Sequence, residues 1–136
     1  MVTAMPVDET LPVRSSHDIV VVRQVVRSWA VELGFNLIEQ TKIVTAASEL
    51  ARNTIDHGGG GTVRLQSLRD GGRIGLRLTF EDKGPGIADL SLALKDGYTT
   101  GTGLGLGLSG AKRLSNEFNI ESRPGEGTRV MITRWK

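Results

Sequence analysis

The chain has 136 residues, a formal net charge of +2 and no cysteine, which is enough for one domain with a single core and excludes a disulfide framework and thiolate metal sites. Its arginines are scattered and aromatic residues make up only 4%, whereas nucleic-acid recognition usually needs clustered cations or stacking rings. No basic segment leads into an apolar run at the N-terminus, and the longest aliphatic stretch is Ile19–Val22. We therefore expect a cytoplasmic protein that is neither exported nor membrane-spanning.

The first predicted elements are an edge strand and a helix. Residues 7–14 contain a proline among apolar positions, which is typical of a short edge strand. Ser15 and Ser16 then offer an N-cap, and apolar residues recur at helical spacing up to Gly34, a natural residue just beyond a helix end. The other face of this helix carries Arg23 and Arg27 one turn apart, which suits either a solvated face or a surface for a partner.

A second, longer helix is predicted from Asn36 to about His57. Asn36 and Glu39 have the spacing of a capping box, and four glycines, Gly58–Gly61, end the helix. We therefore expect an uninterrupted helix whose length is set by local signals at both ends.

This second helix has two distinct faces. At about 100° per residue, Glu49, Asn53 and His57 fall within an arc of roughly 80°. A separate apolar face is formed by Ile43, Ala47, Leu50 and Thr54. One side can therefore pack into the core while the other presents an acid, an amide and an imidazole to a site.

Hairpins dominate the rest of the chain. Strands at 62–68 and 73–80 flank a turn at Asp70–Gly72, and glycine and proline after Asp82 begin a loop. The remaining predicted elements are a short helix at 89–95, a flap at 96–103, a helix at 105–117, and strands at 120–122 and 128–135 joined by a turn at 123–127. This order predicts an α+β fold: a single domain over residues 1–136 with a two-layer α/β sandwich, in which helices cover one face of a mixed, largely antiparallel sheet.

Two glycine-rich segments suggest a nucleotide with its phosphates and metal. Glycines allow backbone N–H groups to approach an anion closely, and a following helix N-terminus adds a partial positive charge. The polar face of the long helix and these segments form three blocks in order: Glu49-x-x-x-Asn53, Asp82-x-Gly84-x-Gly86 and Gly101-x-Gly103-x-Gly105-x-Gly107.

The three blocks together resemble the N, G1 and G2 boxes of the GHKL ATPase superfamily, which has the Bergerat fold. Within it the chain is most similar to the small anti-sigma-factor serine/threonine kinases, and more narrowly to the switch kinases of bacterial stress-signalling cascades. The similarity extends over nearly the whole chain, from Ser16–Ile19 to Gly125–Trp135. The tetraglycine after His57 and the doubled Gly-Leu repeat at 103–108 are less typical of that pattern.

The resemblance implies roles for individual residues. Asp82 would accept a hydrogen bond from the adenine amino group, Thr128 would help to fix the same ring through water, and Asn53 would coordinate Mg²⁺, which favours oxygen ligands. Glu49 would act as the general base. The other implied ATP-binding residues are Gly84, Gly86, Ile87, Thr100, Gly101, Thr102, Gly103, Leu104, Gly105, Leu106 and Gly107; among these, Gly103, Gly105 and Gly107 would donate backbone hydrogen bonds to the phosphates.

The same resemblance implies an ATP- and Mg²⁺-dependent kinase that phosphorylates a serine of a STAS-domain antagonist protein and then binds a downstream phosphatase or regulator. A homodimer is compatible with this family. One alternative is a nucleotide-dependent anti-sigma or regulator-binding module with little kinase activity. A sensor histidine kinase domain is disfavoured by the short flap at 87–100 and by the absence of a helix bearing a phosphoacceptor histidine, and a gyrase- or MutL-type ATPase would need a transducer domain.

Simpler interpretations exist for single residues. Asp82 could merely cap a turn, Glu49 could be a surface acid, and His57 could favourably face the C-terminal dipole of its helix. Arg52 could support a partner or simply be exposed. The functional hypothesis therefore depends on the three blocks occurring together.

Overall fold

The computed structural model describes residues 8–87 and 107–136. The predicted short helix at 89–95, the flap at 96–103 and the candidate residues from Thr100 to Leu106 lie outside these ranges.

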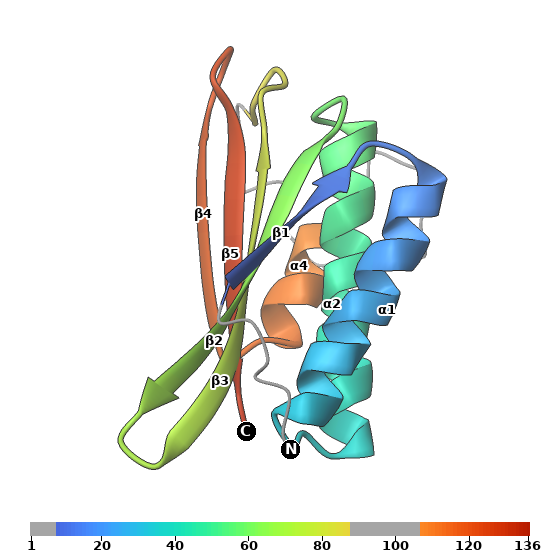
Figure 1. The fold of residues 1–136 in the computed structure, drawn as a ribbon. Coiled ribbons are helices and arrows are strands. Elements are labelled where there is room, and N and C mark those ends of the chain that lie inside the picture. The colour runs from blue at the N-terminus through green and yellow to red at the C-terminus, as the bar shows by residue number, and fades with distance from the viewer. Residues whose placement is uncertain (1–7, 88–106) are drawn as a thin grey trace.

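The fold has two layers, a five-stranded sheet in the order β1-β2-β3-β5-β4 and helices on one of its faces (Figure 1). The elements are β1 (Asp8–Val13), α1 (Ser16–Glu32), α2 (Leu37–Asp56), β2 (Gly61–Asp70), β3 (Arg73–Asp82), α4 (Gly107–Arg113), β4 (Glu117–Arg123) and β5 (Gly127–Trp135). The predicted α+β sandwich and the edge position of the first strand are confirmed.

The expectation of a mixed sheet was wrong for the described residues. Every strand pairing there is antiparallel. β4 lies at the edge of the sheet, and a tight turn joins it to β5. β5 therefore lies between β4 and β3, and it runs antiparallel to both. No parallel pair is needed to bring β3 and β5 together.

Both long helices begin at the predicted caps. The Ser15 side chain accepts a hydrogen bond from the Asp18 backbone N–H at 3.3 Å. In the second helix Asn36 and Glu39 form the reciprocal capping box, with distances of 2.8 and 3.2 Å. These local bonds satisfy amide groups that a helix start otherwise leaves unpaired.

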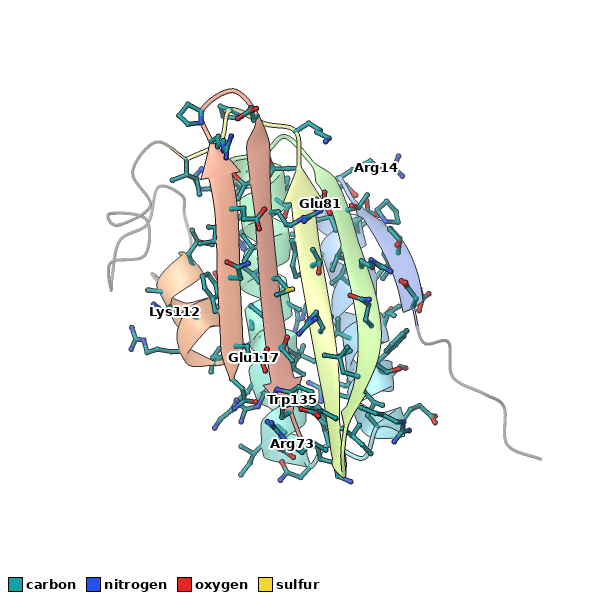
Figure 2. The ribbon with its side chains drawn as sticks, turned by 90° about the vertical axis from the view of Figure 1, so that its left-hand side faces the viewer. Arg14, Arg73, Glu81, Lys112, Glu117 and Trp135 are labelled. Atoms are coloured by element: carbon teal, nitrogen blue, oxygen red, sulfur yellow. The ribbon has the colours of Figure 1, made fainter. Side chains whose placement is uncertain are left out.

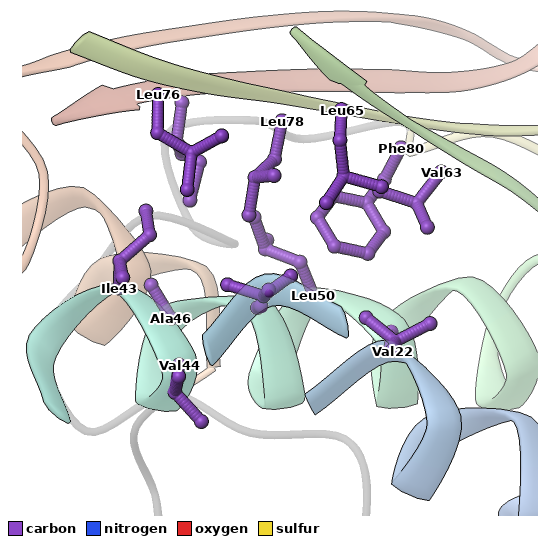
Figure 3. Packing of buried hydrophobic residues seen from close by; sticks show 14 of the residues in the cluster. Val22, Ile43, Val44, Ala46, Leu50, Val63, Leu65, Leu76, Leu78 and Phe80 are labelled. Atoms are coloured by element: carbon purple, nitrogen blue, oxygen red, sulfur yellow. The ribbon is translucent and has the colours of Figure 1, made fainter. Parts of the chain in front are cut away.

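The core lies between the sheet and the helices. Figure 3 shows Leu76 and Leu78 of β3 directed toward α2, where Ile43 and Leu50 meet them. The buried residues of α2 are Ile43, Val44, Ala46, Ala47, Leu50, Ala51 and Thr54, which confirms the predicted apolar face. α2 also packs against α1 and α4, so its half-buried residues Glu49 and Asn53 are carried by a well-supported helix.

The helix predicted at 105–117 ends earlier than expected. α4 stops at Arg113, and Glu117 already pairs with Thr133 as the first residue of β4. The Asn116 backbone N–H donates to the Thr133 carbonyl at 2.9 Å, and the Asn116 side chain accepts from the Trp135 N–H at 2.6 Å. The prediction failed because Phe118 suits both patterns: it extends a helical series of apolar residues, but it also alternates with Ile120 in a strand.

The other face of the sheet is polar and is not covered by any described helix (Figure 2). Arg129 pairs with Glu81 at 3.2 Å, and Arg77 pairs with Glu117 at 3.5 Å. The Arg73 guanidinium lies 4.3 Å from the centre of the Trp135 ring. Arg129 and Glu81 lie on the neighbouring strands β5 and β3, whereas Arg77 and Glu117 lie on β3 and β4 with β5 between them. Opposite charges thus neutralise one another across this face. Among the described helices, none combines the length and the apolar character needed to span a membrane.

Candidate functional site

Three segments that are distant in sequence meet at one end of the molecule: the end of α2, the loop after β3 and the turn between β4 and β5 (upper end of Figure 1). The Gly125 N–H donates to the Pro85 carbonyl at 2.7 Å, which joins the loop to the turn. Gly58, just beyond α2, packs against Asp82 at the end of β3.

The last turn of α2 is held by the glycines that follow it. The N–H groups of Gly59 and Gly60 donate to the carbonyls of Ile55 and Thr54 at 3.1 and 2.9 Å. Asn53 lies in this turn and accepts, through its carbonyl, a 2.9 Å bond from the N–H of His57. The helix end that carries Asn53 is therefore fixed, whereas the His57 side chain is exposed at the C-cap.

Asp82 is packed directly against the end of α2. A Cβ atom added to Gly58 would lie 2.2 Å from Asp82 Cγ, so only glycine fits there without displacing the carboxylate. Asp82 Oδ1 accepts a hydrogen bond from the Gly84 N–H at 2.9 Å. Within residues 8–87 and 107–136 its other oxygen has no hydrogen-bond partner, which leaves an oriented acceptor beside the helix that carries Asn53.

The loop after β3 is locked onto the β4–β5 turn. Gly86 has φ +76, and a Cβ there would lie 2.1 Å from the Arg123 carbonyl oxygen. The N–H of Ile87 donates to Ser122 Oγ at 2.7 Å, and Ser122 Oγ lies 2.8 Å from Thr128 Oγ1. The loop backbone, Ser122 and Thr128 therefore form one connected group.

An open cavity of about 600 Å³ lies at this end of the sheet. Its described lining residues are Glu81, Asp82, Lys83, Ile120, Glu121, Ser122, Arg123, Glu126, Gly127, Thr128 and Arg129. Asp82 and Thr128 pair directly across β3 and β5. Neither Glu49 nor Asn53 is among the described residues that line this cavity, and they join the group only through the end of α2.

The structure thus brings together Asp82, Gly84, Gly86, Ile87 and Thr128, with Asn53 in the adjacent last turn of α2 and Glu49 one turn earlier. Gly107, the described part of the third glycine block, is the first residue of α4, which packs on α2.

Sequence reasoning missed two residues of this region. Gly58 was interpreted only as a helix terminator, and Ser122 was not singled out. Both matter through contacts with segments far along the chain, and no local pattern indicates such contacts.

Comparisons with known proteins give a consistent family. Residues 38–136 match the model of the family described as histidine kinase-, DNA gyrase B-, and HSP90-like ATPase. The serine/threonine-protein kinase RsbT of Bacillus subtilis (strain 168) is 44% identical over 123 residues, which cover 90% of this chain and 92% of RsbT. An anti-sigma F factor of Thermoanaerobacter sp. (strain X514) is 31% identical over 119 residues, covering 83% of this chain and 82% of the relative.

Solved structures share the fold. The RsbU and RsbW domains of a Mycobacterium tuberculosis protein superpose with a TM-score of 0.67 at 24% identity, over 98% of this chain and 33% of that one. The catalytic domain of the histidine kinase ThkA superposes with a TM-score of 0.51 at 18% identity, over 93% and 95% of the two chains. At these identities the similarity concerns the fold alone.

Proposed function

The chain belongs to the family of histidine kinase-, DNA gyrase B- and HSP90-like ATPases, and on this premise we propose that it is an ATP-dependent protein serine/threonine kinase of a partner-switching pathway that regulates a sigma factor. The observation that carries the proposal is the 44% identity to a serine/threonine-protein kinase over 92% of that kinase. We further propose that residues 1–136 act as one domain, in the cytoplasm, where ATP-dependent control of transcription takes place.

The geometry supports ATP as the phosphoryl donor. Asp82 is an oriented hydrogen-bond acceptor, which suits the amino group of adenine, and the close contact at Gly58 keeps its carboxylate in place. Thr128 lies opposite Asp82 in the sheet and would contact the same ring through water. Gly84, Gly86 and Ile87 would line the base, and the third glycine block, from Thr100 to Gly107, would bind the phosphates.

Asn53 and Glu49 lie one helical turn apart on α2, and both are half-buried. Mg²⁺, when bound, would neutralise charge on the phosphates, and the Asn53 amide oxygen suits this hard cation. Glu49 would accept the proton of the acceptor serine hydroxyl. As it does so, the serine oxygen forms a bond to the γ-phosphorus, and the bond between that phosphorus and the oxygen that leaves with ADP breaks. The chain would thus supply the base and the positioning, which phosphoryl transfer mainly requires.

The proposed acceptor is a serine of a small STAS-domain antagonist protein, and the proposed later partner is a phosphatase or another downstream regulator. A second candidate function is a nucleotide-dependent anti-sigma module with little kinase activity. It is favoured by the 31% identity to an anti-sigma F factor. The half-buried carboxylate one turn before Asn53 favours the kinase.

The kinase proposal is tested by incubating the purified chain with Mg²⁺, ATP and a candidate STAS-domain protein, and measuring the mass of the acceptor. The wild-type chain should add one phosphate to a serine. Glu49→Gln should bind ATP as tightly as wild type but lose transfer, because general-base catalysis contributes about 10²–10⁴-fold.

The matched control is Glu32→Gln, an exposed acid at the end of α1, which should leave transfer unchanged. Full transfer by Glu49→Gln would show that the general-base assignment is wrong. ATP binding without transfer by the wild-type chain would favour the anti-sigma module instead.

A further inference from the structure

The hydroxyl of Ser122 connects two residues that the proposed function assigns to ATP. Its oxygen accepts a hydrogen bond from the Ile87 N–H at 2.7 Å and lies 2.8 Å from Thr128 Oγ1. The Gly127 carbonyl lies 3.1 Å away as an acceptor for the same hydroxyl. Ser122 is half-buried on β4 and lines the cavity described above.

The hydroxyl of Ser122 lies within hydrogen-bonding distance of all three neighbours. A serine hydroxyl has one proton to donate and two lone pairs. One lone pair accepts from Ile87; the proton is given either to Gly127 or to Thr128, and in the former case Thr128 donates to Ser122. In both arrangements the Thr128 hydroxyl is hydrogen-bonded to Ser122 Oγ, which restricts the orientation of its remaining donor and acceptor sites.

The sheet register places this group beside Asp82. Ser122 pairs with Thr128 across β4 and β5, and Thr128 pairs with Asp82 across β5 and β3. We propose that Ser122 is a positioning residue for recognition of the purine base: it fixes the Thr128 hydroxyl and the Ile87 backbone relative to the Asp82 carboxylate. This inference rests on the proposed binding of ATP.

A fixed arrangement of hydroxyl and carboxylate allows the site to distinguish bases. Adenine presents an amino donor and a ring-nitrogen acceptor, whereas hypoxanthine presents a carbonyl oxygen and a ring N–H. A site built to hydrogen-bond one pattern rejects the other because its buried polar groups are then left unpaired. A Thr128 hydroxyl that Ser122 no longer held would adapt to either base, and discrimination would fall.

The test is calorimetric titration of the full chain with ATP and with inosine triphosphate, both with Mg²⁺. Ser122→Ala should weaken ATP binding by about three- to tenfold, the range expected for one hydrogen bond, and should weaken inosine triphosphate binding less. The ratio of the two Kd values should therefore narrow. Ser122→Thr keeps the hydroxyl and should restore the wild-type ratio.

Ser115→Ala is the matched control, since Ser115 is also half-buried and donates to a backbone carbonyl, that of Ala111, at 2.7 Å. It should leave the ratio unchanged. If circular dichroism shows that Ser122→Ala does not fold, Ser122→Cys replaces it, because a thiol of similar shape is a weak donor and should narrow the ratio in the same way.

Equal weakening of both nucleotides, or no change in either, would overturn the positioning role while leaving ATP binding intact. Failure of the wild-type chain to bind either nucleotide would overturn the proposed function together with this inference, so the two failures are distinguishable.

Discussion

The position of the Asp82 carboxylate depends on the absence of a side chain at Gly58. The carboxylate occupies the space that a Cβ of Gly58 would need, and one of its oxygens is bound by the Gly84 N–H. The end of α2 and the end of β3 are therefore in van der Waals contact at the point where the adenine amino group is expected. A side chain at Gly58 should therefore act on nucleotide binding by displacing the Asp82 carboxylate.

Gly58→Ala should weaken ATP binding by at least about tenfold while the chain still folds, because a methyl 2.2 Å from Asp82 Cγ forces the carboxylate out of place. Titration calorimetry measures the affinity, and circular dichroism measures the fold. Gly72→Ala is the control, since a Cβ there meets no atom within 4 Å, and it should bind ATP like wild type. Wild-type affinity in Gly58→Ala would mean that Asp82 does not need its observed position.

Sequence reasoning at the level of residues succeeded where the relevant spacing is local. The helical period alone placed Glu49 and Asn53 beside each other and away from the buried face of α2. It could not find Gly58 or Ser122, because their distant partners, Asp82 and Ile87, are brought near only by the packed fold.

Among the elements, α2 connects the core to the site. Its start is fixed by the Asn36 capping box and its end by the glycine bonds to Thr54 and Ile55. The capping box at Asn36 lies at the opposite end of α2 from Asn53. Stability and nucleotide binding should therefore be separable along this one helix.

Asn36→Ala should lower the free energy of unfolding by about 1 kcal/mol, because it leaves the amide of Glu39 without its cap. The same variant should bind ATP with unchanged affinity. Chemical denaturation measures the first quantity and titration the second, with Asn119→Ala, an exposed amide on β4, as the control for both. Loss of ATP affinity without loss of stability would contradict this separation.

Element boundaries were predictable where a cap or turn residue marks them. The caps at Ser15 and Asn36, the hairpin turn at Gly71 and Gly72, and the turn before β5 were all expected and are observed. The end of α4 was not, because Phe118 fits a helix as well as a strand. The decision there is made by the pairing of Asn116 and Glu117 with β5.

At the scale of the molecule, one face of the sheet packs on helices and the other is charged. The predicted order of helices and hairpins indicated this two-layer arrangement. The order of the elements did not predict that β3 would pair with β5 rather than with β4. Hairpin turns predict pairing only between strands that follow one another in the sequence, and β4 is the strand that follows β3. That pairing is what sets Asp82 opposite Thr128 and creates the candidate site.

We propose that this end of the fold binds Mg-ATP through Asn53 and Asp82. Calorimetric titration of the chain with ATP, with and without Mg²⁺, tests it most directly, in wild type, Asn53→Ala and the control Asn119→Ala. We predict saturable, Mg²⁺-dependent binding in wild type and in the control, and its loss in Asn53→Ala. Absence of binding in wild type would contradict the proposed ATP site, and equal binding by Asn53→Ala would contradict the proposed role of Asn53.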